Sequence, residues 1–558
     1  MEENEKKITS GEPLPDNPVS SAETPTQPAK TTHSTPLPPP SRTVTYVPKM
    51  KEKTEYTVKE AIFALISVAF AYFFVDTCLN SNCGLGLFAL VCGFAAIVVA
   101  YQLINRIKFT VRSIVCLVLL LASGATMFLF DGYLSVDTFF LDMALGLYWL
   151  FVSLGGSISK KFDYLAWFDA LKSWFILPFS AFGRGFAAFF SVCFGKSAES
   201  KKKRVALYVI IGIIVAAIPC SLVVNELMSD AAFSALIEKI FSFDDLNIGE
   251  TIGKLVLSIP ISCYLFGALF SATRSPKKEM FTYESTHTAA NEARFIPLLV
   301  VCTALTPLLI VYLLYFFSQT AYFVSAFSNI LPSGFTYAEY ARNGFFELCR
   351  VSVINLVVIA AAEIFSRYAG KKPIVLKVYN SILSVFTLAL MVIAQSKLAM
   401  YIRTYGMTPK RVNTFWFSIV LGVVFFFILL YQFIPKINFT RCAAVSFAVL
   451  FCALIFSNTD AMIARYNIEK YKSGETKTLD TDLLCYNLSD SAVPVIIEEY
   501  DTLPDESPKK AIDIYFTEWA KRIEIRGDKT DSDWRDFNLS SSRAEKLILE
   551  KYGTKSDK

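Results

Sequence analysis

Histidine and charged residues are scarce in this chain of 558 residues. His33 and His287 are its only histidines, and 18% of its residues are Asp, Glu, Lys or Arg, against about 25% in average soluble domains. Histidine is the commonest metal ligand and the side chain that titrates near neutral pH. We therefore expect no histidine-based metal site or proton relay, no bound metal and no cofactor.

Catalytic signatures are missing as well. The sequence contains no GxSxG, HExxH, P-loop, GxGxxG or CxxC motif, each of which sets a nucleophile, a metal or a phosphate in a defined backbone context. An enzyme is therefore not indicated. The net charge of +5 does not require a nucleic-acid partner, because the cytoplasmic loops of membrane proteins are basic in any case.

Hydrophobic residues are in excess, at 54% of the chain, and they occur in blocks of about 20 residues, long enough to span a bilayer as a helix. Only helices satisfy their backbone within lipid at that length. The pattern predicts an all-α polytopic membrane protein in a lipid bilayer, with a small soluble helical region at its C-terminal end. Its eleven spans lie near residues 58–76, 84–104, 112–130, 135–155, 205–225, 252–273, 295–317, 344–366, 375–399, 412–433 and 440–458.

The chain divides into five parts. These are a disordered, Pro-rich cytoplasmic tail (1–50), a first group of four transmembrane helices (55–160), a basic and aromatic interfacial segment (161–204), a second group of seven helices (205–460) and a soluble C-terminal region (461–558). The stretch 163–195 is ambiguous, because Asp169, Lys172, Pro178 and Arg184 interrupt it. We interpret it as interfacial helices broken at Pro178; if it crosses the membrane, the topology changes.

The distribution of basic residues predicts the orientation. Lys and Arg concentrate in alternate connections, including 49–59, 106–112, 160–161, 201–204, 274–294 and 367–377. The positive-inside rule then makes the N-terminus cytoplasmic, and eleven spans put the C-terminus outside a cell membrane. In the C-terminal region, the apolar spacing over 511–525 fits an amphipathic helix, although about 95 residues support only a small core.

Residues 334–355 carry the main candidate site. Thr336 and Glu339 form a capping-box pattern that predicts a helix start at Thr336, and Glu347 and Arg350 then share one face near the membrane entry. Because charges in hydrocarbon are costly, we expect a polar site for a lipid headgroup, an ion or a proton. The alternative is an Arg–Glu pair that only fixes packing, or an outward-reaching arginine. The candidate residues are Glu339, Arg342, Glu347, Arg350 and Asn355.

A second polar patch covers residues 401–413. Thr408 as N-cap and Pro409 at the first helical position open the tenth span. The predicted topology puts Arg403, Lys410 and Arg411 outside, against the usual bias. They are candidates for contacts with external anions or phospholipid headgroups; the alternative is ordinary helix-flanking charge.

Four stretches, taken together, resemble a known family. They are TYAEYARNGFFEL (336–348), YGMTPKR (405–411), ARYNIEKY (464–471) and LDTDLLCYNLSDSAVP (479–494). Their order around the last spans resembles the bacterial multipass family called domain of unknown function 4173, and its sibling 4153, over about residues 200–500. The resemblance implies a polytopic helical fold and a bacterial cell membrane. It carries no established activity and no catalytic residue.

Three functional hypotheses follow. The leading one is a non-enzymatic envelope scaffold or sensor with an outward C-terminal region, whose partner is an envelope lipid or protein. The second is a transporter or flippase that uses the polar face at Glu347 and Arg350. The third is a membrane glycosyltransferase-like enzyme, for which Asp244 and Asp245 are the only candidate acids. The sequence leaves the ligand and the oligomeric state open.

Overall fold

The computed structural model describes residues 55–80, 84–132, 134–159, 162–194, 223, 227, 230, 248–274, 282–328, 337–368, 370–527 and 533–553, with the backbone alone at 193–194, 248–249, 252, 319–328 and 337–344. Within these ranges, ten helices are long and apolar enough to cross a membrane. They match ten of the eleven predicted spans, and the eleventh, 205–225, lies outside the described residues. The all-α prediction is confirmed. The strands found in the described part are β1 (Ile296–Pro297) and β2 (Ser366–Arg367), which pair in parallel.

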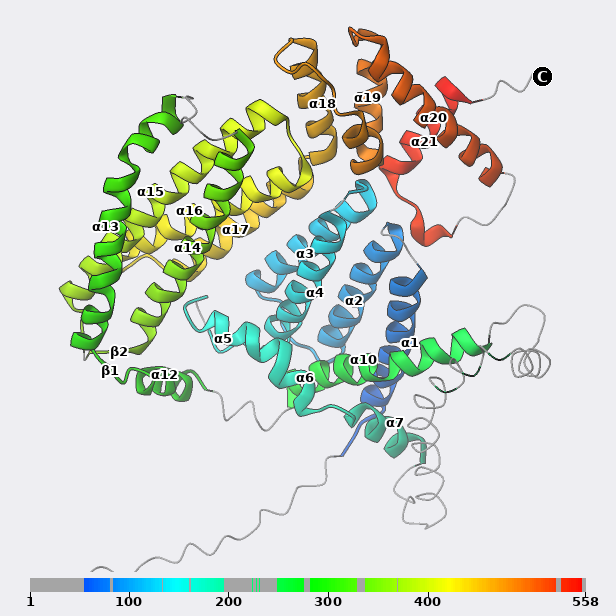
Figure 1. The fold of residues 1–558 in the computed structure, drawn as a ribbon. Helices are drawn as coiled ribbons and strands as arrows, with labels where there is room; N and C mark the ends of the chain where they lie inside the picture. The colour runs from blue at the N-terminus through cyan, green and yellow to red at the C-terminus, as the bar shows by residue number, and fades with distance from the viewer. Residues whose placement is uncertain are drawn as a thin grey trace, which may run out of the picture. The chain divides into compact units, whose positions relative to one another are not determined.

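The first helix group contains four sequential antiparallel spans, a bent segment and one span from later in the chain (Figure 1). Its elements are α1 (Val58–Asn80), α2 (Leu85–Ile104), α3 (Val111–Leu129), α4 (Leu134–Ser153), α5 (Ala166–Leu171), the π-helical η1 (Lys172–Ile176), α6 (Leu177–Ser180), α7 (Arg184–Phe194) and α10 (Ile248–Arg274).

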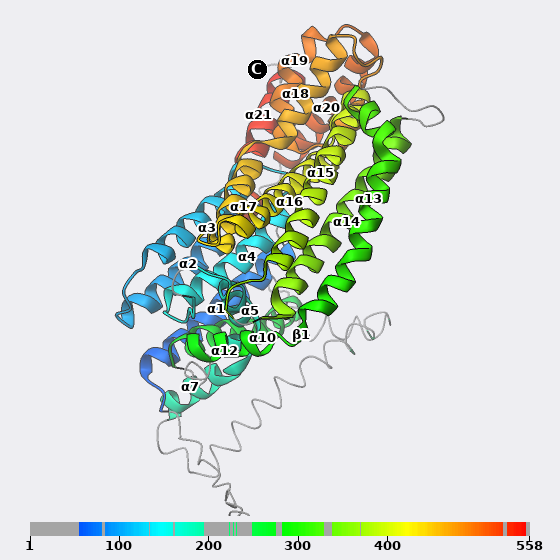
Figure 2. The same cartoon turned by 90° about the vertical axis from the view of Figure 1, so that its left-hand side faces the viewer.

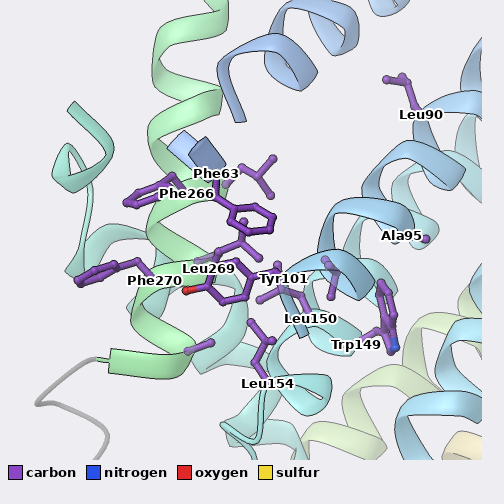
Figure 3. Packing of buried hydrophobic residues seen from close by; sticks show 14 of the residues in the cluster. Phe63, Leu90, Ala95, Tyr101, Trp149, Leu150, Leu154, Phe266, Leu269 and Phe270 are labelled. Carbon is purple, nitrogen blue, oxygen red and sulfur yellow. The ribbon is translucent and has the colours of Figure 1, made fainter. Parts of the chain in front are cut away.

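Aromatic and aliphatic side chains from α1, α2, α4 and α10 form the core of this group (Figure 3). Phe63 meets Tyr101 edge to face, with ring centroids 4.8 Å apart, and the Tyr101 hydroxyl lies 3.0 Å from Thr273 Oγ1. Trp149 is fully buried, and its indole N–H donates to Ser113 Oγ at 3.2 Å. The polar tips of buried rings are thus hydrogen-bonded, as apolar surroundings require.

Helix α10 belongs to the first group, which corrects the sequence-based division that placed it in the second. Ion pairs join both of its ends to α1. Glu60 pairs with Arg274 at 3.1 Å, and Asp76 pairs with Lys254 at 2.7 Å. Periodicity shows that a segment is a helix, but contacts far apart in sequence decide which neighbours it has. We call the Glu60 side of this group the proximal end and the Asp76 side the distal end.

The ambiguous segment forms two helical pieces, 166–180 and 184–192, bent by 46°. The bend lies at 181–183, where Gly183 has φ +81°, so the predicted break at Pro178 is wrong. Proline frees the carbonyl four residues earlier, here that of Trp174, and the Tyr264 hydroxyl of α10 donates to it at 2.6 Å. A neighbouring helix therefore satisfies the backbone at Pro178, as it does in other membrane helices.

The second helix group packs α13 to α17 side by side (Figure 2). Its spans are α13 (Leu298–Ser328), α14 (Tyr337–Phe365), α15 (Ile374–Tyr405), α16 (Pro409–Phe433) and α17 (Phe439–Phe456), preceded by the short exposed helix α12 (Tyr283–Glu292). Helix α14 begins one residue after the predicted start; Thr336 itself lies outside the described residues. Thr408 is the N-cap residue of α16, as predicted, although its side chain makes no capping hydrogen bond.

Residues 459–553 form what we call the C-terminal module. Its elements are α18 (Thr459–Lys472), η2 (Leu483–Asn487), η3 (Asp490–Ala492), α19 (Val493–Glu499), η4 (Tyr500–Thr502), α20 (Glu506–Gly527), η5 (Trp534–Asp536) and α21 (Leu539–Tyr552). Ile512 and Phe516 of α20 are buried against Ile468, Ile496 and Ile548. This core confirms the amphipathic helix predicted within 511–525.

Candidate functional site

The C-terminal module contacts the ends of both membrane helix groups. Toward the second group, Asn467 of α18 binds the loop between α15 and α16. Its Oδ1 accepts from the Met407 N–H at 2.7 Å, and its Nδ2 donates to the Met407 carbonyl at 2.8 Å. Asn467 is 9% exposed. One side chain therefore satisfies both backbone groups of Met407, as a strand partner would.

Gly406 makes this close approach possible. It caps the C-terminus of α15 with φ +78°, a conformation that favours glycine. A Cβ atom at this position would lie 2.6 Å from Asn467 Oδ1. Two of the stretches that carried the family resemblance, 405–411 and 464–471, thus bind each other directly.

Two cationic side chains donate to carbonyls at the C-terminus of α15. Lys470 donates to the Arg403 carbonyl. Arg411 donates to the carbonyls of Tyr405, at 2.9 Å, and Gly406, and its guanidinium lies 4.2 Å from the ring centroid of Tyr401. A helix leaves its last carbonyls without intrahelical partners, and its dipole attracts positive charge there. Arg411, predicted to contact external anions, therefore has internal partners, while Arg403 and Lys410 are exposed.

Toward the first group, the module binds the loop between α3 and α4. Ser489 Oγ and Ser491 Oγ donate to the Asp131 carbonyl at 2.6 and 2.7 Å, and the Asp131 N–H donates to Ser540 Oγ at 2.7 Å. Asn538 donates from Nδ2 to the Met127 carbonyl at 3.0 Å. These contacts satisfy backbone groups at the end of α3 and in the following loop, the same mode of binding that Asn467 uses on the second group.

An ion network continues this interface at the distal end of α1. Asp76 accepts from Lys254 at 2.7 Å and from Arg535 of η5, and Arg535 also pairs with Asp533. The side chains of Asp76 and Arg535 are 22% and 15% exposed. The module is thereby tied to α1 and α10 by charges held largely away from water, where ion pairs are screened least.

Three carboxyl groups meet where the module covers the loop between α3 and α4. The charges of Asp490 and Asp460 both raise the pKa of Asp131, and a cavity of about 30 Å³ adjoins Asp131 and Asp460. Burial, and then the charge of Asp490, raise the pKa of Asp131 to about 6. Burial also raises the pKa of Asp460 and of Asp490. Asp460 accepts from the Ser489 N–H at 3.2 Å through Oδ2, whereas its buried Oδ1 has no partner.

The sequence did not single out these acids. The available signal is that Asp131 and Asp460 each follow directly on a span predicted to end on the same side of the membrane. Among the described residues, no group of His, Cys, Asp or Glu side chains is arranged to hold a metal ion.

The predicted polar site on α14 is only partly assembled. Glu347 and Arg350 are exposed, and within the described ranges no ion pair joins them. The Glu347 carboxylate instead interacts electrostatically with the buried Lys397. Asn355 is fully buried and accepts from the Tyr312 hydroxyl at 2.6 Å. The side chains of Glu339 and Arg342 lie outside the described residues, as do Asp244 and Asp245.

Sequence reasoning also missed a polar cluster at the end of α14. Glu363 pairs with Lys372 and accepts from Asn380 Nδ2 at 2.8 Å. Lys372 also donates to Gln432 of α16. The members of this cluster lie on α14, on α15, on α16 and in the connection before α15. Spacing along the chain therefore gives no sign that they meet.

Comparison with curated proteins finds no match, and comparison with solved structures finds none either. A family model does match, over residues 61–499, which extends the resemblance noted for 200–500 into the first helix group and includes the C-terminal module as far as α19. Its description assigns no activity. Because this match covers well over half of the sequence, the chain belongs to the family described as Domain of unknown function (DUF4153).

Proposed function

We propose that this protein is a non-enzymatic membrane scaffold or sensor in which the C-terminal module couples the two helix groups. One observation carries the proposal: a module with its own hydrophobic core binds backbone groups at the ends of both groups, through Asn467 on one side and Asn538 on the other. A displacement of either helix group then changes the contacts of the module with the other.

Reciprocal coupling is the property to test, because a coupling free energy acts equally in both directions. Asn538→Asp keeps the oxygen that caps α21 and removes the Nδ2 donor to the Met127 carbonyl. We expect faster amide hydrogen exchange at Met407, on the opposite helix group, in the full-length protein in lipid nanodiscs. Asn487→Asp, at an exposed asparagine of the same module, is the matched control. Unchanged exchange at Met407 would show two independent attachments and no coupling.

The contacts also support an outward module with a cytoplasmic N-terminus. The module binds the distal end of the first group, whereas the ring of Tyr56, just before α1, contacts Phe270 at the proximal end. Both pieces of the bent segment contact the proximal end: Asp169 accepts from the Ile158 N–H at 2.9 Å, and Arg184, at the start of the second piece, lies over Phe270. These contacts favour a re-entrant path for 163–195.

The eleven predicted spans include 205–225, which lies outside the described residues, and an odd total puts the two termini on opposite sides of the membrane. A cysteine at Lys546, whose side chain is 77% exposed, tests the topology. We expect a membrane-impermeant maleimide to label Lys546→Cys in intact cells above the background of the parent protein. Labelling only after lysis would contradict the outward module.

Transport remains the second candidate, and one observation favours it. The second helix group buries two polar clusters along α14, at Asn355 and at Glu363, and polar groups within membrane helices often mark a pathway. If the predicted site acts in transport, Glu347→Gln abolishes uptake or lipid movement in proteoliposomes while the folded protein is retained. Normal transport by this variant would remove Glu347 from the mechanism.

A further inference from the structure

The first helix group contains a cavity of about 400 Å³ that the proposed coupling does not use. It lies between α1, α2, α4, the bent segment and α10, and rings of Phe70, Phe94, Phe139 and Phe179 form much of its wall. Small-molecule sites typically measure about 300–1,000 Å³. Protein interiors are otherwise close-packed, with few voids larger than a water molecule. A space of this size is therefore too large for a packing defect and can hold a ligand.

The cavity contains one carboxyl group. Asp142, near the middle of α4, is the one charged side chain among the described residues that line it. Its side chain is 2% exposed. Ser123 donates to Oδ1, while Oδ2 is buried without a hydrogen-bond partner. Buried polar atoms nearly always have partners, so Oδ2 indicates a group that the protein itself does not supply.

The cavity opens toward the hydrocarbon. Phe179 and Met143 line it and are 60% and 39% exposed, and both belong to apolar segments. A ligand therefore enters from the membrane, through the side of the helix group. A cavity of about 150 Å³ holds benzene, so this one holds a chain on the order of 15 carbon atoms.

The hydrogen-bonding needs of Asp142 define the head of that ligand. A hydroxyl group both donates and accepts, so it pairs with Oδ2 whether the carboxyl is ionised or protonated. An ammonium group has three donors, and the apolar walls would leave two of them unpaired. We propose that this cavity binds a single-chain lipid alcohol, with its hydroxyl on Asp142 and its chain against the phenylalanine rings.

Photolabelling tests the proposal on the full-length protein in phosphatidylcholine liposomes. The probe is a diazirine-bearing hexadecanol, and peptides from α4 and α10 are mapped by mass spectrometry. We expect labelling that unlabelled hexadecanol competes, and that hexadecane competes about 10- to 100-fold less well, as one buried hydrogen bond to a carboxyl group predicts. Equal competition by the alkane, or no labelling of α4 and α10, would overturn the proposal.

Two variants and a second head group complete the test. Asp142→Leu should abolish the preference for alcohol over alkane. Met143→Trp narrows the opening and keeps Asp142, so it should reduce labelling. This second variant tests the site even if Asp142→Leu does not fold. A preference for alcohol that persists in Asp142→Leu, or labelling unchanged in Met143→Trp, counts against the site. Stronger competition by hexadecylamine than by hexadecanol would refute an alcohol as the ligand.

Discussion

Asn467→Ala should release the C-terminal module from the second helix group. The substitution removes the acceptor for the Met407 N–H and the donor for its carbonyl, at 2.7 and 2.8 Å. Leaving a buried backbone group unpaired costs about 1–3 kcal/mol. Met407 is half-buried, so water recovers part of that cost, and we expect a loss of about 2–4 kcal/mol in the free energy of docking for the two bonds. This is a large part of a typical stability of about 5–15 kcal/mol.

Amide hydrogen exchange in detergent or nanodiscs measures this loss. Because each 1.4 kcal/mol is a factor of ten in an equilibrium constant, the Met407 amide should exchange about 30- to 700-fold faster. The amides of Leu484 and Val493 in the core of the module should also lose protection if docking stabilises its fold. Asn487→Ala, at an exposed asparagine, should leave all three unchanged.

Exchange at Met407 within about threefold of the wild-type rate would contradict a docking role for Asn467, since that change is less than 1 kcal/mol. A rate increase confined to Met407, with Leu484 and Val493 unaffected, would show that the asparagine contact is local. The module would then be held in place by its contacts with the first helix group alone.

Three further predictions concern the first helix group and its contact with the module. Burial raises the pKa of Asp131 to about 6. The stability that the protonated carboxyl contributes is complete below about pH 4, the ordinary pKa of Asp, and is lost as the pH rises through about 6. The loss is about 3 kcal/mol at most. Thermal unfolding should therefore show Asp131→Asn gaining stability relative to wild type between pH 5 and 7.5; a parallel pH dependence would contradict this. Gly267→Leu should lower the unfolding temperature of the full chain through a cost of about 2–3 kcal/mol, because a Cβ there would lie 2.3 Å from the Pro178 carbonyl oxygen. Gly253→Ala, where nothing lies within 4 Å, is the control in the same helix, and equal effects of the two changes would rule out the close approach. Tyr264→Phe removes the donor to the Trp174 carbonyl, which Pro178 leaves without an intrahelical partner. The change should destabilise the protein by about 1–3 kcal/mol in denaturant titrations; a wild-type midpoint would show that the hydroxyl is not needed.

Much of the architecture was open to prediction from the sequence. Ten predicted spans, the start of α16 at Pro409 and the amphipathic helix within 511–525 agree with the structure. Each depends on local properties: an apolar run long enough to cross lipid, a proline suited to the first turn of a helix, or a 3.6-residue repeat of apolar side chains. The same short stretches that carried the family resemblance lie in the matched range 61–499.

Which residues form a site was decided by tertiary contacts. Glu347 and Arg350 lie three residues apart on α14 but form no ion pair among the described residues, and the Glu347 carboxylate interacts electrostatically with Lys397 of α15. Asp142 lines a cavity and Glu363 pairs with Lys372, and neither contact is marked by a local sequence pattern. A charge in an apolar span finds its partner on another helix, at a sequence distance that no local pattern records.

The sequence by itself determined that this protein is a polytopic helical membrane protein, because hydrocarbon leaves the backbone of a long apolar segment no alternative to the helix. Only the tertiary structure decided that α10 joins the first group and that one module binds the ends of both groups. Those choices depend on ion pairs, close glycine contacts and backbone hydrogen bonds between residues up to several hundred positions apart. Their energies exist only once the helices have come together.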